Sequence, residues 1–429
     1  MTHFDDVLRR AYEVLTADPG TANVDRVTVL RDMRGRVRLF PQPAADQAVA
    51  VAKLCERVAP RLSEELGCFW GGLIEADDER SDMAALLRSV EDEREPLDAL
   101  GFGGWSIVER HAAKAAWLGR SAEPPWPFHE GAPPVVSFFS HKGGVGRTTA
   151  LCATAVNFAR AGYPVAVVDL DVEAPSLGAL LESGAELGAV DYLLERVLGA
   201  VQPDVEFQRF VVPQRDPVLI GPEGAPIYCV PAGLLAASYL EKLARLDYEL
   251  LGDLGTLNRN PLADLLRQLR SAYEPALILL DCRSGLHDLG GLAVHGLSHL
   301  EVLFGLDSEP SWQGIRLLLG SLSRVGDALP NCAVVHALEP EAPGEVRDRA
   351  RERFLEASYD AFLELYYADT ETESVPDIGN EDAPHFPFRI PYLRAMAGYQ
   401  RLADVAEVLT GDPLRQFAAW VGGRAGKPL

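Results

Sequence analysis

The sequence predicts an α/β fold in which a doubly wound, mostly parallel sheet follows a small α/β module at the N-terminus. Three observations predict it: strands and helices alternate after residue 134, several of these strands are short apolar runs, and a glycine-rich turn joins the first of them to a helix. Parallel strands that are buried on both faces have this continuous apolar character. We therefore divide the chain into a module over 1–120, a proline-rich linker over 121–133 and a main domain over 134–429.

The composition is that of a globular protein with an acidic surface. Of the 429 residues 48% are apolar, and 40 Lys and Arg stand against 63 Asp and Glu, which gives a net charge of −23. Such a surface repels nucleic acid and anionic lipid, so we expect neither as a partner. The six cysteines form no C-x-x-C pair, which argues against a paired-cysteine metal site and fits a reduced, cytoplasmic protein. No apolar stretch approaches the roughly 18 residues of a membrane span, and the first residues do not resemble a signal peptide.

The N-terminal module alternates helical and extended segments. Helices are predicted over 4–15 and 44–66, the second broken at Pro60, and strands over 26–30, 37–40, 68–74 and 104–110. The acidic stretch 75–98 is interpreted as a solvated helix with its loops, and a specific acidic docking surface is the alternative. In the linker region, Trp117 and Trp126 are predicted to pack as anchors. That this module binds a protein partner is a hypothesis.

A glycine-rich turn over 140–149 is the centre of the main domain. The apolar run 134–139 predicts a strand, residues 150–158 predict a helix, and SHKGGVGRTT stands between them. Glycines let backbone N–H groups converge on an anion, and the positive end of the helix dipole adds to the attraction. The turn therefore predicts a phosphate-binding loop. The alternative is a glycine-rich turn without a ligand, and two acidic motifs later in the chain weigh against it.

Two later strands end in acidic residues. One apolar run leads into Asp169 and Asp171, and another, ALILLD, ends at Asp281. The carboxyl ends of parallel strands meet at one edge, where open α/β sheets bind ligands. Acids at such an edge can serve Mg²⁺ and orient an attacking water, and the Thr148 hydroxyl can join the same metal. The alternative for the first pair of acids is that they only cap the following helix.

The rest of the main domain continues the alternation. Helices are predicted over 188–198, 262–273, 312–322 and 344–353, and strands over 302–306 and 333–336. The last helix, 414–421, has one apolar side, and because it is short and weakly basic we expect it to pack on the main domain and not on a membrane.

The three motifs, in this order and with this strand context, resemble those of the ParA/MinD family of P-loop ATPases, which belongs to the SIMIBI class. KGGVGRTT is similar to the deviant Walker A loop of that family in its KGGVGR variant, VDLD followed by EAPSL to its Walker A′ segment, and ALILLD to its Walker B strand. The resemblance covers residues 134 to about 410. It implies ATP and Mg²⁺ as ligands and a homodimer that forms in response to nucleotide.

The resemblance also implies a role for each site residue. Lys142 would reach across the dimer to the partner's nucleotide, Asp171 would position the attacking water, and Asp169 would support the metal shell together with Thr148 and Asp281. The residues expected to hold the nucleotide in the loop are Lys142, Gly143, Gly144, Val145, Gly146, Arg147, Thr148 and Thr149. Arg147 stands where the family usually has lysine. A guanidinium can grip two phosphate oxygens but is bulkier than an ammonium, so binding is expected to survive and the rate of hydrolysis is in question.

Two more segments complete the expected nucleotide site. Asp281 is followed by CRSGL, similar to a run of the KGGVGR subgroup, which implies that Arg283 senses the γ-phosphate; an ion pair with an acid at the dimer surface is the alternative. FRIPYL resembles the family's Ile-Pro segment, whose backbone lies against the base, so Pro391 is the candidate there. Where the family often has an asparagine that reads adenine, the chain has His336 to Glu339. Adenine is therefore expected from the family alone.

These inferences predict a slow ATP hydrolase that acts as a dimerisation switch: ATP holds two chains together and ADP lets them part. The alternative is a pseudo-ATPase scaffold that binds nucleotide without turnover and recruits a partner protein. Partitioning of DNA cargo is a third reading, which the negative charge disfavours. The resemblance also suggests, as a hypothesis, a place in a bacterial defence or signalling assembly.

Overall fold

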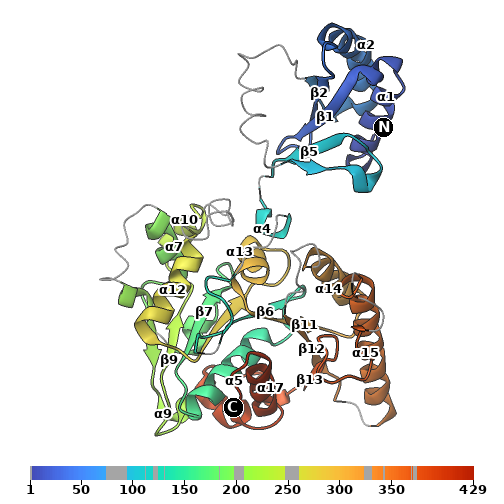
Figure 1. The fold of residues 1–429 in the computed structure, drawn as a ribbon. Coiled ribbons are helices and arrows are strands. Elements are labelled where there is room, and N and C mark those ends of the chain that lie inside the picture. Colours follow the sequence, from blue (N-terminus) through green and yellow to red (C-terminus); the bar gives the residue numbers. More distant parts are fainter. Residues whose placement is uncertain are drawn as a thin grey trace. The chain divides into compact units, whose positions relative to one another are not determined.

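The computed structural model of the chain consists of two compact units, Met1–Ala112 and Ala113–Leu429, which Figure 1 shows as ribbons. It describes residues 2–73, 94–111, 113–118, 124–129, 131–182, 184–197, 207–246, 260–322, 331–341, 344–368, 370 and 374–429. Both units combine helices with a sheet. The predicted fold class, a doubly wound sheet domain preceded by a small α/β domain, is confirmed.

The smaller unit is a five-stranded sheet with two helices packed on it, in the strand order β3-β2-β1-β5-β4. Its elements are α1 (Val7–Thr16), β1 (Val24–Arg31), β2 (Val37–Pro43), α2 (Ala48–Leu66), β3 (Trp70–Leu73), β4 (Glu95–Pro96) and β5 (Trp105–Glu109). The prediction that α2 breaks at Pro60 is wrong, because the helix runs through it. Pro60 lies on the exposed side, where water can bond the carbonyl that the missing N–H leaves free. Most of the predicted acidic helix over 75–98 lies outside the described residues.

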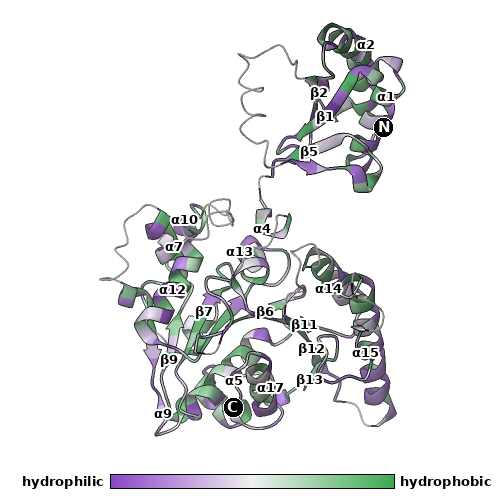
Figure 2. Ribbon diagram, in the orientation of Figure 1, coloured by the Kyte–Doolittle hydropathy of each residue, from purple (hydrophilic) through white to green (hydrophobic). Residues whose placement is uncertain are grey.

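The larger unit is built on an eight-stranded sheet in the order β13-β12-β11-β6-β10-β7-β9-β8. Its strands are β6 (Val135–Ser140), β7 (Val165–Leu170), β8 (Val212–Gln214), β9 (Ile227–Val230), β10 (Leu277–Cys282), β11 (Leu300–Gly305), β12 (Cys332–Glu339) and β13 (Phe388–Pro391). All neighbours are parallel except β8 and β9. Every residue of β6, β7, β10 and β11 is buried, which explains the apolar runs in the sequence. Figure 2 shows the contrast with the largely hydrophilic outer helix α15 (Glu345–Leu365).

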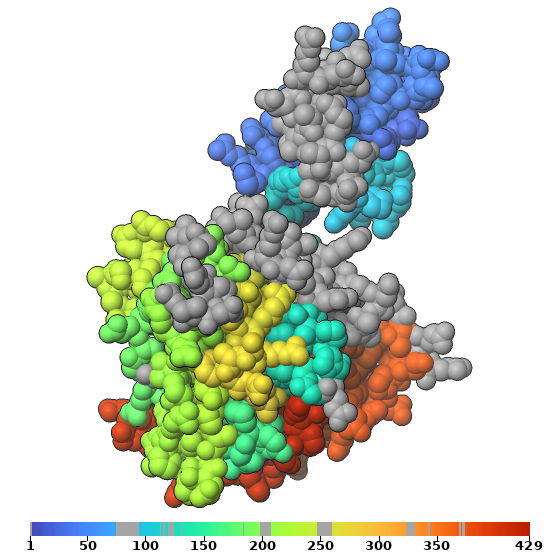
Figure 3. All heavy atoms as spheres, turned by 60° about the vertical axis from the view of Figure 1, so that its left-hand side comes forward, coloured from blue at the N-terminus to red at the C-terminus, as the bar shows by residue number. Residues whose placement is uncertain are grey.

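Helices cover both faces of this sheet. One face packs against α5 (Arg147–Arg160), α9 (Pro217–Ile220), α16 (Ala406–Thr410) and α17 (Leu414–Arg424). The other packs against α7 (Ala189–Val197), α12 (Pro261–Tyr273), α13 (Asp288–Leu292) and α14 (Glu309–Leu322), together with α15. Three short helices complete the unit: α4 (Ala115–Leu118), α6 (Leu177–Leu180) and α10 (Ala237–Leu243). In Figure 3 the green to yellow-green residues that include β8, β9 and α10 form one flank of the larger unit.

The C-terminal helix α17 packs on the body of the larger unit, as predicted. Leu414, Phe417 and Val421 are buried in the same core as α5. Phe417 lies at the centre of an aromatic group, with ring centroids 6.2 Å from Phe138 and 5.4 Å from Phe388. Within the described residues, no helix is long and apolar enough to cross a membrane.

The first residues of the larger unit are bound into its core. The boundary between the units falls after Ala112, and both Trp117 and Trp126 are buried in the core of the larger unit. The Trp126 indole N–H donates to the Pro133 carbonyl at 2.9 Å. The proline-rich segment is thus packed by its tryptophans against the sheet domain.

Candidate nucleotide-binding site

The glycine-rich loop connects β6 to the N-terminus of α5. Gly144 and Gly146 have φ of 73° and 83°, a region that costs any residue with a Cβ about 1 kcal/mol or more. Gly146 is the N-cap of α5, and Val145 between them is buried in the core. The loop therefore curves over the start of the helix, the geometry in which backbone N–H groups and the helix dipole bind anions.

A cavity of about 370 Å³ opens beside this loop. Its polar end is formed by the loop and the first turn of α5, including Arg147, Thr148 and Thr149. The opposite end is apolar and is lined by Leu338, Ile390, Pro391, Tyr392, Leu393, Met396, Ala397 and Leu414. A pocket with a polar anion-binding end and an apolar end suits a phosphate ester with an aromatic base.

Pro391 and Leu338 come together at the apolar end through an irregular strand pair. The pairing of β12 with β13 shifts its register between His336 and Glu339, and Leu338 within that shift has φ of 52°. Both residues line the cavity. An apolar side chain thus lies close to where the sequence comparison with the family expected an amide. The position of Leu338 depends on the register shift between β12 and β13, which no sequence pattern predicts.

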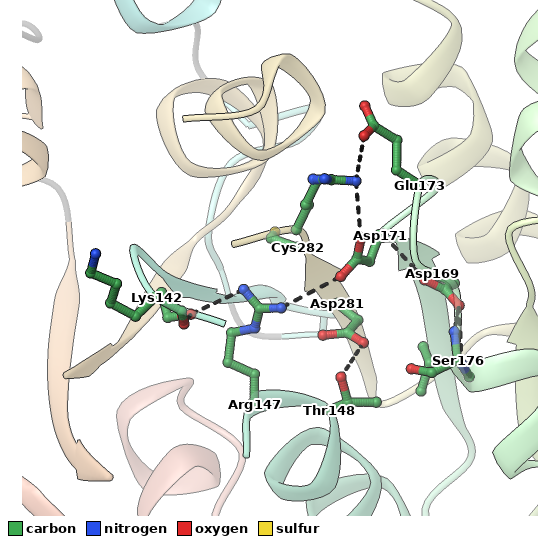
Figure 4. A network of polar contacts seen from close by, with 12 residues as sticks. Lys142, Arg147, Thr148, Asp169, Asp171, Glu173, Ser176, Asp281 and Cys282 are labelled. Carbon is green, nitrogen blue, oxygen red and sulfur yellow. Dashed lines mark hydrogen bonds and ion pairs between the residues drawn. The ribbon is translucent and has the colours of Figure 1, made fainter. Parts of the chain in front are cut away.

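Arg147, the first residue of α5, lies buried between the loop and the acids. Its guanidinium donates to Ser140 Oγ at 3.0 Å and lies 3.6 Å from Asp171 Oδ2, as Figure 4 shows. Ser140 Oγ in turn donates to the Lys142 carbonyl at 2.6 Å. Burial makes this charge effective, because fewer waters screen it from an anion at the mouth of the loop. The role of Ser140 had no signal in the sequence beyond its place before the loop.

Thr148 and Asp281 form the centre of a candidate Mg²⁺ site. The Thr148 hydroxyl donates to Asp281 Oδ2 at 2.7 Å. The other oxygen of Asp281, and Oδ1 of Asp171, are buried and have no hydrogen-bond donor. Buried carboxylate oxygens without a donor, next to a hydroxyl, are hard oxygen ligands of the kind that Mg²⁺ takes. The residues present therefore fit the metal that the sequence predicts.

Asp169 is held differently from the other acids. One of its oxygens accepts the backbone N–H groups of Ser176 and Leu177 at 3.0 Å each, and the other accepts the N–H of Asp171 at 3.1 Å. These contacts cap α6 and fix the turn that presents Asp171. The capping alternative thus describes the contacts of Asp169, while its support of a metal stays a prediction.

Two of the clustered acids, Asp169 and Asp281, have raised pKa values. Burial raises the pKa of Asp281 to about 6, against the lowering effect of the Thr148 hydrogen bond and of Arg147. Burial, together with the negative charge of Asp281, also raises the pKa of Asp169 well above its usual range. Removing carboxylates from water disfavours their charged form, and a divalent cation would relieve this cost.

The raised pKa of Asp281 predicts a pH dependence of stability. Its carboxyl holds a proton more tightly in the folded state than at its usual pKa of 3.8, so its contribution to the free energy of unfolding should fall as the pH rises from about 4 through about 6. We expect Asp281→Asn to remove this contribution; the slope that remains belongs to the other buried groups with shifted pKa values, among them Asp169 and Glu301. Urea unfolding midpoints from pH 4 to 7, with EDTA and without nucleotide, measure the slope. Equal slopes for the two proteins would contradict the assignment.

Lys142 and Arg283 differ in their contacts with the acids. The Lys142 side chain is exposed, and Figure 4 shows that it extends away from the carboxylates. No described acid pairs with its ammonium group. Arg283 lies with its guanidinium 2.7 Å from Glu173 and 3.9 Å from Asp171. The ion pair considered as the alternative for Arg283 is therefore present within the chain.

Glu173 is a residue of this region that the sequence analysis did not single out. Its carboxylate also lies 3.1 Å from His287 Nε2, and His287 is the N-cap of α13. Glu173 lies in the turn that follows β7, in which the Ala174 N–H donates to the Asp171 carbonyl at 3.1 Å; its sequence context gave no signal for it.

One family model matches the chain, and several solved structures are similar to it. A sequence model of the CobQ/CobB/MinD/ParA nucleotide-binding domain matches residues 136–407. A comparison with curated protein sequences gives no match. Among solved structures, MinD of Pyrococcus horikoshii OT3 with Mg-ADP is 15% identical with a TM-score of 0.43, covering 68% of this chain and 98% of that one.

Two further structures are similar to the same degree. The MinC:MinD complex of Aquifex aeolicus is 15% identical with a TM-score of 0.41, covering 68% of this chain and 96% of that one. The ParA protein of pNOB8 bound to nonspecific DNA is 13% identical with a TM-score of 0.41, covering 68% and 99%. The family model spans well over half of the chain, and it confirms the resemblance to ParA and MinD that the motifs predicted. The chain therefore belongs to the CobQ/CobB/MinD/ParA family of nucleotide-binding domains.

Proposed function

We propose that the chain is an ATP-binding, Mg²⁺-dependent ATPase that works as a nucleotide-controlled dimerisation switch. One observation carries the proposal: the buried Arg147 and the Thr148 hydroxyl, which line the cavity, contact two carboxylates that each have a buried oxygen without a hydrogen-bond donor. Such a set can bind a phosphate chain, a metal and an attacking water together.

The proposed binding of ATP divides the cavity between its two ends. The loop from Lys142 to Thr149 and the Arg147 guanidinium hold the phosphates, and Pro391 with its apolar neighbours holds the base. Thr148 and Asp281 hold Mg²⁺, with Asp169 in support. When bound, the metal neutralises charge on the phosphates. The cavity fits this division, because Arg147, the charged residue of its lining, lies at the loop end.

The proposed chemistry assigns the water to Asp171. Its buried, donor-free Oδ1 can accept a proton or a hydrogen bond from a water aimed at the γ-phosphate. Arg283, held near it by Glu173, is placed to sense the same phosphate. Catalysis would be mainly electrostatic, because phosphoryl transfer needs charge stabilisation and alignment more than covalent chemistry.

The proposed dimer follows from Lys142. Its ammonium group is exposed and extends away from the site of its own chain, so it is available to neutralise charge on the nucleotide of a second copy. ATP would then join two chains through their active sites, and loss of the γ-phosphate would let them part.

Light scattering after size-exclusion chromatography tests the switch. With ADP we expect the mass of one 46.6 kDa chain, and with a slowly hydrolysed ATP analogue and Mg²⁺ the mass of a dimer. Lys142→Ala should form less dimer at the same concentration, because a charge contact between the chains is lost. A monomer in every condition would refute the switch.

The rival function is a scaffold that binds nucleotide without turnover and recruits a partner protein through the N-terminal unit. It is favoured by one observation: Arg147, which stands where the family usually has lysine, lies 3.6 Å from the acid proposed for hydrolysis. If Arg147 keeps this ion pair when nucleotide is bound, the Asp171 carboxylate is not free to position a water, and hydrolysis would not occur. A role in a defence or signalling assembly and a cytoplasmic location stay hypotheses in either case.

DNA is the third candidate partner. The net charge of −23 disfavours it, but an average charge does not exclude a local contact. The pNOB8 ParA structure contains nonspecific DNA. A gel shift with random DNA in the presence of ATP decides the matter for this chain.

A further inference from the structure

The segment 113–118, with which the larger unit begins, is bonded to the loop that carries Arg283. The Lys114 backbone N–H and its ammonium group donate to the two oxygens of Asp288, at 2.5 and 2.7 Å. Lys114 has φ of 70°, which is uncommon for a residue with a side chain and costs about 1 kcal/mol or more. The two hydrogen bonds to Asp288 stabilise this backbone conformation of Lys114. Segment 113–118 is thus attached to the larger unit at Asp288.

Trp117 makes a second attachment to the same loop. Its indole N–H donates to the His287 carbonyl at 2.9 Å. The ring packs so closely on Gly291 that a Cβ there would lie 2.6 Å from Nε1. The ring also contacts Phe139, the residue before Ser140, with centroids 5.6 Å apart. The indole therefore fills the space between the start of α13 and the end of the strand that leads into the phosphate loop.

The loop over 283–288 is held at its other points by the candidate nucleotide site. The Gly285 N–H donates to the Ser140 carbonyl at 3.0 Å. Arg283 and His287 both contact Glu173, at 2.7 and 3.1 Å. The loop thus touches the phosphate loop, the acids that follow β7 and the segment 113–118. The contacts with any two of these three segments therefore oppose a movement of the 283–288 loop that follows the third.

We propose that Lys114 and Trp117 are positioning residues for the Arg283 loop, and that docking of segment 113–118 is coupled to recognition of the γ-phosphate. The inference rests on the proposed function, since it assigns Arg283 to that phosphate. Preorganised contacts bind more tightly because less ordering remains to be done on binding. Docking should therefore strengthen the binding of ATP, and by linkage ATP should strengthen docking.

The coupling has a consequence for the N-terminal unit. That unit ends at Ala112, one residue before the docked segment begins. The bound nucleotide would accordingly change how stably segment 113–118, which follows the N-terminal unit in the chain, is docked. A partner of the unit that changes the docking would alter ATP affinity in return.

A matched pair of tryptophan variants tests the proposal in the full-length chain. Trp117→Phe and Trp126→Phe each remove one indole N–H bond of 2.9 Å to a backbone carbonyl, and only the first lies on the Arg283 loop. We expect Trp117→Phe to weaken binding of a slowly hydrolysed ATP analogue about five-fold or more and to leave ADP affinity unchanged. Trp126→Phe should leave both affinities unchanged. Isothermal titration of the unaltered protein and of both variants measures the six constants.

Lys114→Ala provides a second variant should the Trp117 variant unfold, because the Lys114 side chain is 44% exposed. It should show the same selective loss, and Lys114→Arg, which keeps the charge, should recover most of it. Equal losses for ADP and the ATP analogue, or equal losses in the two tryptophan variants, would overturn the coupling and leave the proposed function standing. Failure of the unaltered protein to bind either nucleotide would overturn both.

Discussion

Replacement of Asp171 by alanine is expected to lower the rate of phosphate release about 100-fold or more and to leave ATP binding intact. Asp171 directly follows the end of β7, and its carboxylate lies next to Arg147 and has one oxygen without a hydrogen-bond donor. It does not line the cavity that we assign to the nucleotide. The contacts that hold ATP should therefore survive its removal, whereas the alignment of the attacking water should not.

Phosphate release under single-turnover conditions, with nucleotide affinity measured in parallel, separates these two effects. Asp171→Asn is the matched control for shape, since it keeps the volume and removes the charge, and it should be nearly as slow as the alanine variant. If the unaltered protein released phosphate no faster than either variant, hydrolysis would be refuted. The scaffold function, in which Arg147 holds nucleotide without turnover, would then take its place.

The sequence was sufficient to predict the glycine-rich turn and the sheet. Positive φ at Gly144 and Gly146 follows from the need of a tight turn, and glycine meets that need at low cost. The buried strands β7 and β10 bring Asp169 and Asp281 into register as direct neighbours, and parallel strands always place their carboxyl ends at one edge. Both features depend on local chain geometry, and short sequence motifs are sufficient to predict such geometry.

Contacts between distant segments were not predictable in the same way. Lys114 and Asp288 are 174 positions apart, and neither belongs to a motif. The Arg147 contact with Asp171 requires the rotamers of both side chains. The helix predicted over 344–353 continues as α15 to Leu365, because no glycine or proline stops it before that point. Packing decides such features, and packing leaves little trace in local sequence.

The trans role of Lys142 is the part of the proposal with the most distinctive expected result. Lys142→Ala alone should reduce hydrolysis about 100-fold or more, because the developing charge on the transferred phosphate loses a cation. This loss by itself does not show which chain the lysine serves. Its exposed side chain extends away from Asp171, so the two residues should act in different chains on one nucleotide.

Mixing the two inactive variants distinguishes the chains. In a dimer of one Lys142→Ala chain with one Asp171→Ala chain, the first chain keeps its own Asp171 and receives an intact Lys142 from the second, so one of the two sites is complete. Random pairing at equal amounts and high concentration should then recover up to about a quarter of the unaltered rate in a symmetric dimer. If Lys142 served its own chain, every site in the mixture would lack one of the two groups. The mixture would then be as slow as each variant alone, because no pairing of chains could assemble a complete site.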